Sequence, residues 1–239
     1  MKKLRRKMTR MKRVELDSGC RVIDDDDLSE MRLTCMHWEK MRKQSGLVMN
    51  DKERKITAYH EAGHAILARL LPGCDPVQEV SIIPRGLAAG YTMTRPDSDD
   101  THIEKSKLLD DIVMTLGGRV AEKLTLDDIS TGASNDIERA TEIARNMVTK
   151  YGMSDNIGMI CYTNDDDEVF IGRDLAHTRS YSEGVAATID SEVKSIIDNA
   201  YAEAKRIILE HREVLDACAE LLLEKEKITR DEFEALFES

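Results

Sequence analysis

The chain has 239 residues, of which 41% are hydrophobic and 34% are charged. This length is enough for one main domain with a sizeable core. Aromatic residues make up only 4%, and the C-terminal half is rich in Ala, Glu, Lys, Leu and Ile, which favours helices over a β-sandwich or barrel. The formal net charge is −11, although residues 1–13 carry eight Lys and Arg and no acid. The acidic remainder argues against a nucleic-acid-binding protein, because phosphates would be repelled.

The cysteines and the hydropathy indicate the compartment. Five cysteines are scattered without a Cys-x-x-Cys pair, which is typical of reduced thiols in a reducing compartment. No segment approaches the roughly 20 apolar residues that a membrane-spanning helix needs, and the most apolar run, residues 65–71, contains Arg69. The basic N-terminus does not lead into an apolar signal segment. We therefore expect a cytoplasmic chain, with membrane association through a partner or the basic N-terminus as the alternative.

Apolar periodicity and turn residues predict a series of helices interrupted by one pair of strands. In chain order, helices are expected over residues 28–43, 51–71, 103–124, 134–150, 184–227 (as one or two helices) and from Thr229, and strands over residues 79–83 and 88–94. Thr229 and Glu232 match a capping box at the start of the last helix. Gly117 and Gly118 lie inside the predicted helix 103–124 at a cost of about 1 kcal/mol each, so we expect another backbone to pack closely against them.

One segment indicates a reaction: His60-Glu61-Ala62-Gly63-His64, inside the predicted helix 51–71. Residues four apart on an α-helix lie on one face, so both imidazoles can reach one metal ion. Zinc accepts imidazole nitrogen, and catalytic zinc sites use three protein ligands and leave one position open. Glu61 projects from nearly the same side and can act as a general base. The alternative interpretation is two surface histidines near a helix acid.

The third ligand must come from elsewhere, because the extension His-x-x-Gly-x-x-His is absent: Leu67 and Leu70 stand at its Gly and His positions. Spacing alone leaves several candidates open. They are Glu79, Glu104, Glu122, Asp127, Asp128, Asp136 and His102. The other histidines have no partner ligand nearby in the sequence, and we interpret them as surface or packing residues. They are His37, His177 and His211.

The segment Ala58–Ala65 (AYHEAGHA) resembles the zinc helix of the FtsH family of ATP-dependent metalloproteases. The resemblance extends from about residue 45 to the C-terminus, and five more segments carry it in the family's order. They are Gly117–Glu122 (GGRVAE), Ser130–Asp136 (STGASND), Ala144–Val148 (ARNMV), Tyr151–Ser154 (YGMS) and Val169–Arg173 (VFIGR). The resemblance implies a mainly α (α+β) fold: a helical zinc metallopeptidase domain with a small β-sheet beside the HExxH helix and long C-terminal helices.

The resemblance also implies roles for individual residues. The third zinc ligand of the family is the Asp of the segment GASND, which is Asp136 here; otherwise Asp136 is an acid stabilised in the first turn of a helix. Glu122 is expected to orient a ligand imidazole, because a metal-bound His usually donates its other N–H to such a group. The family's substrate-binding edge strand, to which an extended polypeptide adds as a further strand, corresponds to Gly90, Tyr91, Thr92, Met93 and Thr94.

Members of this family normally carry transmembrane helices and an ATPase module before the peptidase domain, and we find neither pattern. No Gly is followed by Lys, so a Gly-x-x-x-x-Gly-Lys-Ser/Thr loop is absent and no ATP site is expected in this chain. We interpret residues 1–44 as a basic tail and a remnant helical segment that resembles the end of an ATPase helical subdomain. Residues 45–239 are interpreted as the zinc metallopeptidase domain. The chain is expected to be either a fragment or a stand-alone descendant of the peptidase half.

The leading hypothesis is a zinc-dependent endopeptidase that hydrolyses unfolded or flexible polypeptides by metal-activated water, in processing or protein quality control. It requires one Zn²⁺ per chain, and the resemblance implies a hexameric ring and a separate ATPase or a full-length FtsH-type relative as partner. One alternative is a non-catalytic assembly or regulatory partner of full-length FtsH-type hexamers. Another is a zinc hydrolase of small molecules, which leaves the other family segments unexplained.

Overall fold

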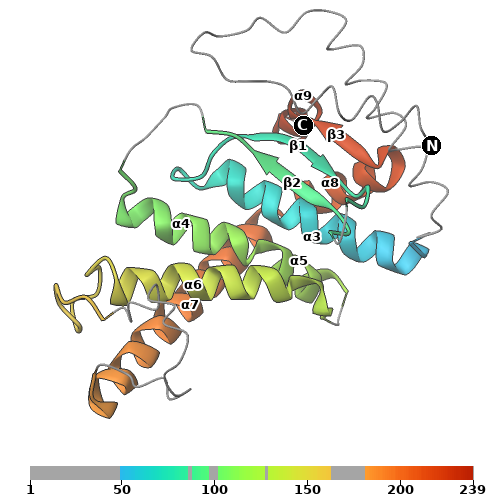
Figure 1. The fold of residues 1–239 in the computed structure, drawn as a ribbon. Helices are drawn as coiled ribbons and strands as arrows, with labels where there is room; N and C mark the ends of the chain where they lie inside the picture. The colour runs from blue at the N-terminus through green and yellow to red at the C-terminus, as the bar shows by residue number, and fades with distance from the viewer. Residues whose placement is uncertain (1–48, 86–87, 97–101, 127–128, 163–180, 239) are drawn as a thin grey trace, which may run out of the picture. The chain divides into compact units, whose positions relative to one another are not determined.

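The computed structural model describes residues 49–85, 88–96, 102–126, 129–162 and 181–238 (Figure 1). The predicted basic tail and remnant helical segment lie outside these ranges. In chain order the elements are α3 (Asp51–Leu70), β1 (Val77–Ser81), β2 (Tyr91–Thr94), α4 (Lys105–Thr115), α5 (Gly117–Thr125), the 3-10 helix η1 (Thr131–Ala133), α6 (Ser134–Thr149), α7 (Glu183–Glu210), α8 (Arg212–Lys225), β3 (Lys227–Thr229), α9 (Arg230–Glu234) and the 3-10 helix η2 (Ala235–Phe237). None of the helices within the described ranges combines the length and the apolar character that a membrane span requires.

Helix α3 is the central element of the fold, and it contacts α4, α5, α7, α8 and both β1 and β2. It begins with a capping box: the Asn50 side chain accepts a hydrogen bond from the Glu53 N–H at 2.8 Å, and the Glu53 carboxylate accepts one from the Asn50 N–H at 3.1 Å. It ends where Leu71 takes an extended backbone conformation before Pro72. The predicted helix over residues 51–71 is therefore confirmed.

The prediction of one continuous helix over residues 103–124 is wrong, because two helices, α4 and α5, meet at Leu116. The backbone of α5 approaches that of α3 too closely for side chains at the crossing. A Cβ on Gly117 would lie 2.8 Å from the carbonyl oxygen of Gly63, and one on Gly63 would lie 2.5 Å from the carbonyl oxygen of Gly117. This contact confirms the close backbone packing that the Gly-Gly pair predicts, and it fixes α5 against the helix that carries the HExxH motif.

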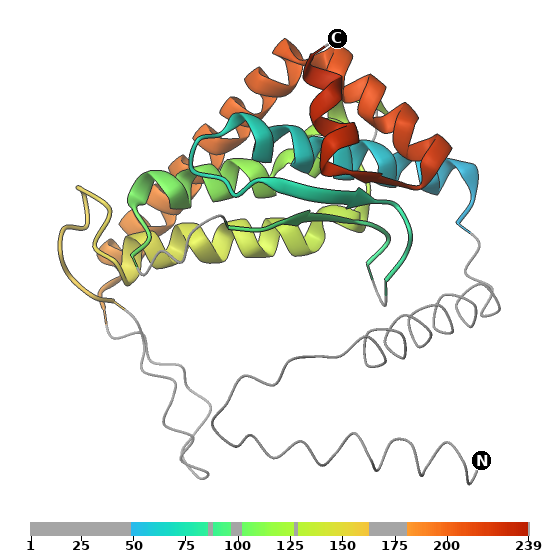
Figure 2. The ribbon, with the colours of Figure 1, turned by 90° about the horizontal axis from the view of Figure 1, so that it is seen from above.

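A three-stranded antiparallel sheet covers one side of α3 (Figure 2). The two predicted strands are confirmed with shifted ends, and they pair with Val80 of β1 opposite Thr92 of β2. The third strand, β3, was not predicted because its three residues carry too little periodicity; it pairs with the other edge of β1, where Ile228 lies opposite Val80. The order β2-β1-β3 leaves β2 with one strand neighbour among the described residues.

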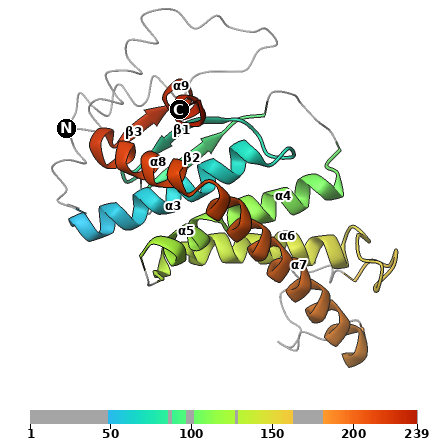
Figure 3. The same ribbon diagram turned by 180° about the vertical axis from the view of Figure 1, so that it is seen from behind.

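Helices α4 to α8 pack together around α3, whereas the short helix α9 contacts the strands β1 and β3. Helix α7 runs obliquely across α4, α5 and α6, and α8 returns to pack on α3 (Figure 3). The segment 184–227 thus forms two helices, which is one of its two predicted forms, and the capping box of Thr229 and Glu232 is confirmed. The mainly α (α+β) fold class is confirmed. The largest fully buried apolar side chains are Ile66, Leu67, Ile112, Met147, Ile189, Ile208, Leu215, Leu222, Ile228 and Phe233.

Candidate metal centre

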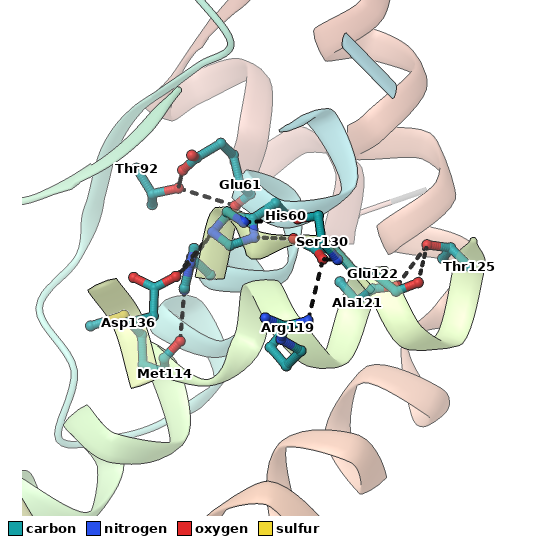
Figure 4. Close-up of polar contacts among 12 residues, drawn as sticks. His60, Glu61, Thr92, Met114, Arg119, Ala121, Glu122, Thr125, Ser130 and Asp136 are labelled. Carbon is teal, nitrogen blue, oxygen red and sulfur yellow. Dashed lines mark hydrogen bonds and ion pairs between the residues drawn. The ribbon is translucent and has the colours of Figure 1, made fainter. Parts of the chain in front are cut away.

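Three side chains bring metal-binding atoms together between α3 and α6 (Figure 4). The Nε2 atoms of His60 and His64 lie 3.1 Å apart. Oδ2 of Asp136 lies 3.1 Å from Nε2 of His60 and 3.5 Å from Nε2 of His64. The imidazoles come from successive turns of α3, and their ring planes meet at 77°. Two nitrogens and one carboxylate oxygen therefore converge on one point.

Asp136 reaches this point because the 3-10 helix η1 and its cap, Ser130, set the start of α6. The Ser130 hydroxyl oxygen accepts a hydrogen bond from the Gly132 N–H at 3.1 Å and so caps η1, which leads directly into α6. Asp136 then lies in the first turn of α6, where the positive end of the helix dipole favours a carboxylate. The helix start thus holds the charge of Asp136 close to the two imidazoles.

The second nitrogen of each imidazole also has a partner. Nδ1 of His60 lies 2.8 Å from Oε1 of Glu122, and Nδ1 of His64 lies 2.9 Å from the carbonyl oxygen of Met114. A carbonyl oxygen and an ionised carboxylate can only accept, so both Nδ1 atoms carry protons and a neutral ring presents a lone pair at Nε2. Glu122 is only 1% exposed, and its Oε2 accepts the Ser130 N–H at 2.9 Å. Both rings are thereby fixed with Nε2 directed at the convergence point.

Three electron-pair donors at these distances repel one another unless a positive charge lies among them. A proton on the His60 imidazole can supply this positive charge. Burial lowers the pKa of His60, but the hydrogen bonds to Asp136 and Glu122 outweigh the effect of burial and raise the pKa to about 9. Burial likewise raises the pKa of Asp136, but the two histidines outweigh it and hold that pKa well below its usual value. A zinc ion can also supply the positive charge. Ligand atoms about 2.0 Å from a tetrahedral zinc lie about 3.3 Å apart, which matches the observed separations of 3.1 to 3.5 Å. The donor set therefore fits zinc.

Glu61 lies next to these ligands and is itself buried, with 7% of its surface exposed. Its Oε2 accepts a hydrogen bond from the Thr92 hydroxyl at 2.9 Å. Burial raises the pKa of Glu61, and the nearby His64 and His60 and the Thr92 hydroxyl offset only part of that rise. A carboxylate whose pKa is raised beside a metal site has the increased proton affinity that a general base needs.

The convergence point opens into a cavity of about 870 Å³. Its walls include the start of α6 on one side and the segment leading into β2 on the other. Four of the five residues predicted for the substrate-binding strand line this cavity, namely Gly90, Tyr91, Thr92 and Thr94. Met93 does not line it and is 44% exposed.

The other third-ligand candidates lie elsewhere or outside the described residues. Glu79 is on β1, where its carboxylate accepts hydrogen bonds from Tyr91 and Lys227. Glu104 is the residue before the first turn of α4, where its side chain makes no capping hydrogen bond, and neither Glu104 nor His102 lines the cavity. The remaining candidates and two of the histidines interpreted as surface or packing residues are outside the described ranges: Asp127, Asp128, His37 and His177. The third such histidine, His211, places Nδ1 3.1 Å from the carbonyl oxygen of Ile207.

Sequence reasoning did not identify three contributors to this site. Ser130 lies within one of the segments that resemble the family, but no pattern in the sequence indicates that its N–H donates a hydrogen bond to Glu122. Thr92 was assigned to substrate binding, and its hydrogen bond to Glu61 depends on how the strand packs on α3. The partner of His64 is the backbone carbonyl of Met114, which no side-chain pattern can reveal.

The fold and the donor set define a zinc metallopeptidase domain of the HExxH type, with two imidazoles from one helix, a carboxylate from a second and a buried Glu between the histidines. The family model described as "Peptidase family M41" matches residues 47–236. This chain belongs to peptidase family M41.

Curated relatives agree with this assignment. The chain is 57% identical over 218 residues to the ATP-dependent zinc metalloprotease FtsH of Caldicellulosiruptor bescii, a match that covers 91% of this chain and 35% of the relative. It is 55% identical over 190 residues to the ATP-dependent zinc metalloprotease FtsH 1 of Thermoanaerobacter sp., covering 80% of this chain and 31% of the relative. The FtsH of Ruminiclostridium cellulolyticum is 53% identical over 192 residues, with 80% and 31% covered. The chain thus spans about a third of the length of these relatives.

Proposed function

We propose that this chain is a zinc-dependent endopeptidase domain that hydrolyses unfolded or flexible polypeptides. His60, His64 and Asp136 are the proposed zinc ligands, and Glu61 is the proposed general base. The observation that carries this proposal is the convergence of two Nε2 atoms and one carboxylate oxygen within 4.8 Å of one another, beside a buried carboxylate. Glu122 is proposed to orient the His60 imidazole through their 2.8 Å contact.

The chemistry assigned to the protein's own residues is proton transfer and orientation. When bound, zinc supplies Lewis-acid chemistry, because it acidifies water and polarises a carbonyl group. Glu61 accepts the proton of the attacking water and then gives a proton to the leaving amine. The position of Glu61 supports this role, because its carboxylate is buried beside the proposed ligands and lines the same cavity. Direct attack by water involves no covalent intermediate with the enzyme.

We propose that the substrate binds in an extended conformation along the free edge of β2. This edge has no strand neighbour among the described residues, and Tyr91, Thr92 and Thr94 line the cavity of the metal site. Pairing between backbones provides affinity with few demands on side chains, but it requires a polypeptide that is not folded. Unfolded or flexible chains are therefore the proposed substrate class.

Assembly and location are proposals that rest on the family. The relatives are named ATP-dependent, and we propose that a separate ATPase or a full-length relative supplies unfolding activity to this chain. A homo-hexameric ring in the cytoplasm, or at a membrane through such a partner, is the proposed assembly. The domain boundary near residue 45 and the nature of residues 1–44 stay predictions.

The direct test is cleavage of an intrinsically unfolded protein by the purified, zinc-loaded chain without ATP. We expect the parent to cleave it, and Glu61→Gln to bind zinc but not cleave. Glu142→Gln, an exposed position on α6, is the matched control and should retain parental activity. If the zinc-loaded parent is inactive, the proposed autonomous activity is wrong, and co-elution with a full-length relative would then favour the non-catalytic assembly partner.

A further inference from the structure

The hydroxyl of Thr92 on β2 lies within hydrogen-bond distance of two oxygen atoms of Glu61 on α3 (Figure 4). Its hydroxyl oxygen lies 2.9 Å from Oε2 of the Glu61 carboxylate and 3.0 Å from the Glu61 backbone carbonyl oxygen. A hydroxyl has one proton and can donate to only one acceptor at a time. The ionised carboxylate is the stronger acceptor, because hydrogen bonds to charged groups are roughly twice as strong as neutral ones.

No other residue in the described part of the chain donates a hydrogen bond to the Glu61 carboxylate. A buried carboxylate with few partners is costly, so the Thr92 hydroxyl is a substantial part of what keeps this side chain in place. The bond occupies Oε2 and leaves Oε1 without a hydrogen-bond donor among the described residues. One carboxylate oxygen is thus anchored, and the other remains for proton transfer.

The same strand segment also restricts the aliphatic part of Glu61. A Cβ on Gly90 would lie 2.9 Å from Cγ of Glu61 and 2.8 Å from Cγ2 of Thr57. The Gly90 backbone therefore packs directly against the stem of Glu61, while Thr92 holds its carboxylate. Residues 90–92 therefore contact both the aliphatic part and the carboxylate of the Glu61 side chain.

We infer that Thr92 is a positioning residue whose hydroxyl holds the Glu61 carboxylate in the orientation that hydrolysis requires. The strand proposed to pair with the substrate then also sets the geometry of the base, so substrate binding and base alignment are coupled through one residue. This inference rests on the proposed role of Glu61 as general base. It is separate from the role of Thr92 in substrate pairing, which uses the backbone and not the hydroxyl.

The test compares Thr92→Val with Thr92→Ser in the zinc-loaded chain. Valine keeps the β-branched shape and the backbone groups of the strand but removes the hydroxyl, whereas serine keeps the hydroxyl. We expect Thr92→Val to lower kcat roughly tenfold with KM and zinc content unchanged, because a misplaced base slows the chemical step and not binding. Thr92→Ser should retain most of the parental kcat.

The matched control is Thr141→Val on α6, where the hydroxyl donates only to the backbone carbonyl of Ile137, at 2.7 Å; it should behave as the parent. The inference is overturned if Thr92→Val keeps the parental kcat, if Thr92→Ser loses as much as Thr92→Val, or if the loss appears in KM.

A double-mutant cycle tests the contact without using catalysis. The melting temperature is measured for four zinc-loaded proteins: the parent, Thr92→Val, Glu61→Ala and the double variant. The change in the double variant should differ from the sum of the two single changes, because each single substitution breaks the same hydrogen bond. Additive changes overturn the inference even if the parent cleaves substrate. If the parent is inactive and the changes in melting temperature are non-additive, the contact between Thr92 and Glu61 is supported. The proposed function is then contradicted, and with it the positioning role of Thr92 in hydrolysis.

Discussion

Gly118 lies so close to the His60 imidazole that a Cβ on Gly118 would be 2.5 Å from Cε1 and 2.6 Å from both ring nitrogens. Gly118 belongs to α5, and Glu122, one turn later on the same helix, binds Nδ1 of that ring. Helix α5 therefore sets the position of His60 by one steric and one polar contact. This arrangement depends on the crossing of α3 and α5 at Gly63 and Gly117.

Gly118→Ala should weaken zinc binding by roughly tenfold or more while the fold is retained. The added methyl group must displace the His60 ring, because contacts below 3.0 Å to its atoms cannot persist. Zinc affinity is measured by competition with a chromophoric chelator. The matched control is Gly184→Ala in α7, where the nearest atom to the added Cβ is 3.9 Å away, and its zinc affinity should equal that of the parent. Parental affinity in Gly118→Ala would contradict the steric role of Gly118.

Glu122→Gln should lower zinc affinity by about ten- to a hundredfold, because a neutral amide orients the His60 ring less strongly than a carboxylate does. The same substitution weakens the bond from the Ser130 N–H, which links Glu122 to the start of α6. The chelator competition measures this effect. Glu138→Gln, at an exposed position of α6, removes one carboxylate outside these contacts and should leave affinity unchanged. Equal affinities in the two variants would exclude an orienting role for Glu122.

Removal of zinc by a chelator should abolish cleavage and lower the melting temperature, and added zinc should restore both. Zinc at a thousandfold excess over its Kd stabilises the folded chain by about 4 kcal/mol, or on the order of 10 °C for a domain of this size.

Asp136→Ala should remove most of this response to the chelator, because it deletes one of the three proposed ligands. Glu104→Ala is the control, since Glu104 lies at the start of α4, makes no capping hydrogen bond with its side chain and does not line the cavity. If Glu104→Ala loses the chelator response and Asp136→Ala keeps it, the third ligand is misassigned.

Glu192 of α7 is expected to contribute to stability in a pH-dependent way. Its carboxylate accepts hydrogen bonds from the Ser154 hydroxyl and the Asn156 amide, both at 2.6 Å, and these bonds hold the pKa of Glu192 below its usual value. A carboxylate whose pKa is lowered by folding stabilises the folded state above its unfolded pKa of about 4.3, and this stabilisation is lost as pH falls through the lower, folded pKa.

We therefore expect the free energy of unfolding of the parent to fall more steeply below about pH 4.3 than that of Glu192→Gln. Urea denaturation at several pH values measures both slopes, and the loss of zinc at low pH cancels in the comparison because both chains share it. Glu213→Gln, at an exposed position of α8, controls for the removal of one carboxylate. If the free energy of unfolding depends on pH equally in the parent and in Glu192→Gln, the Glu192 contacts do not contribute the expected pH-dependent stability.

Local signals in the sequence predicted much of the fold. The helix that carries His60 and His64, the two strands after it and the capping box at Thr229 were all found, because each depends on residues within a few positions of one another. The break at Leu116 and the strand β3 were not found. Both arise from contacts between segments far apart in the chain, namely the approach of α5 to α3 and the pairing of β3 with β1.

The sequence by itself determined that two imidazoles and one Glu share a helix, because a spacing of four places residues on one face whatever surrounds them. It left the third ligand open among several acids and His102, and only a family resemblance favoured Asp136. The tertiary structure decided that Asp136 of α6 faces those imidazoles, that Glu122 and Met114 hold their second nitrogens, and that Thr92 anchors Glu61. Side chains from separate segments meet only when the packing of whole helices and strands brings them together.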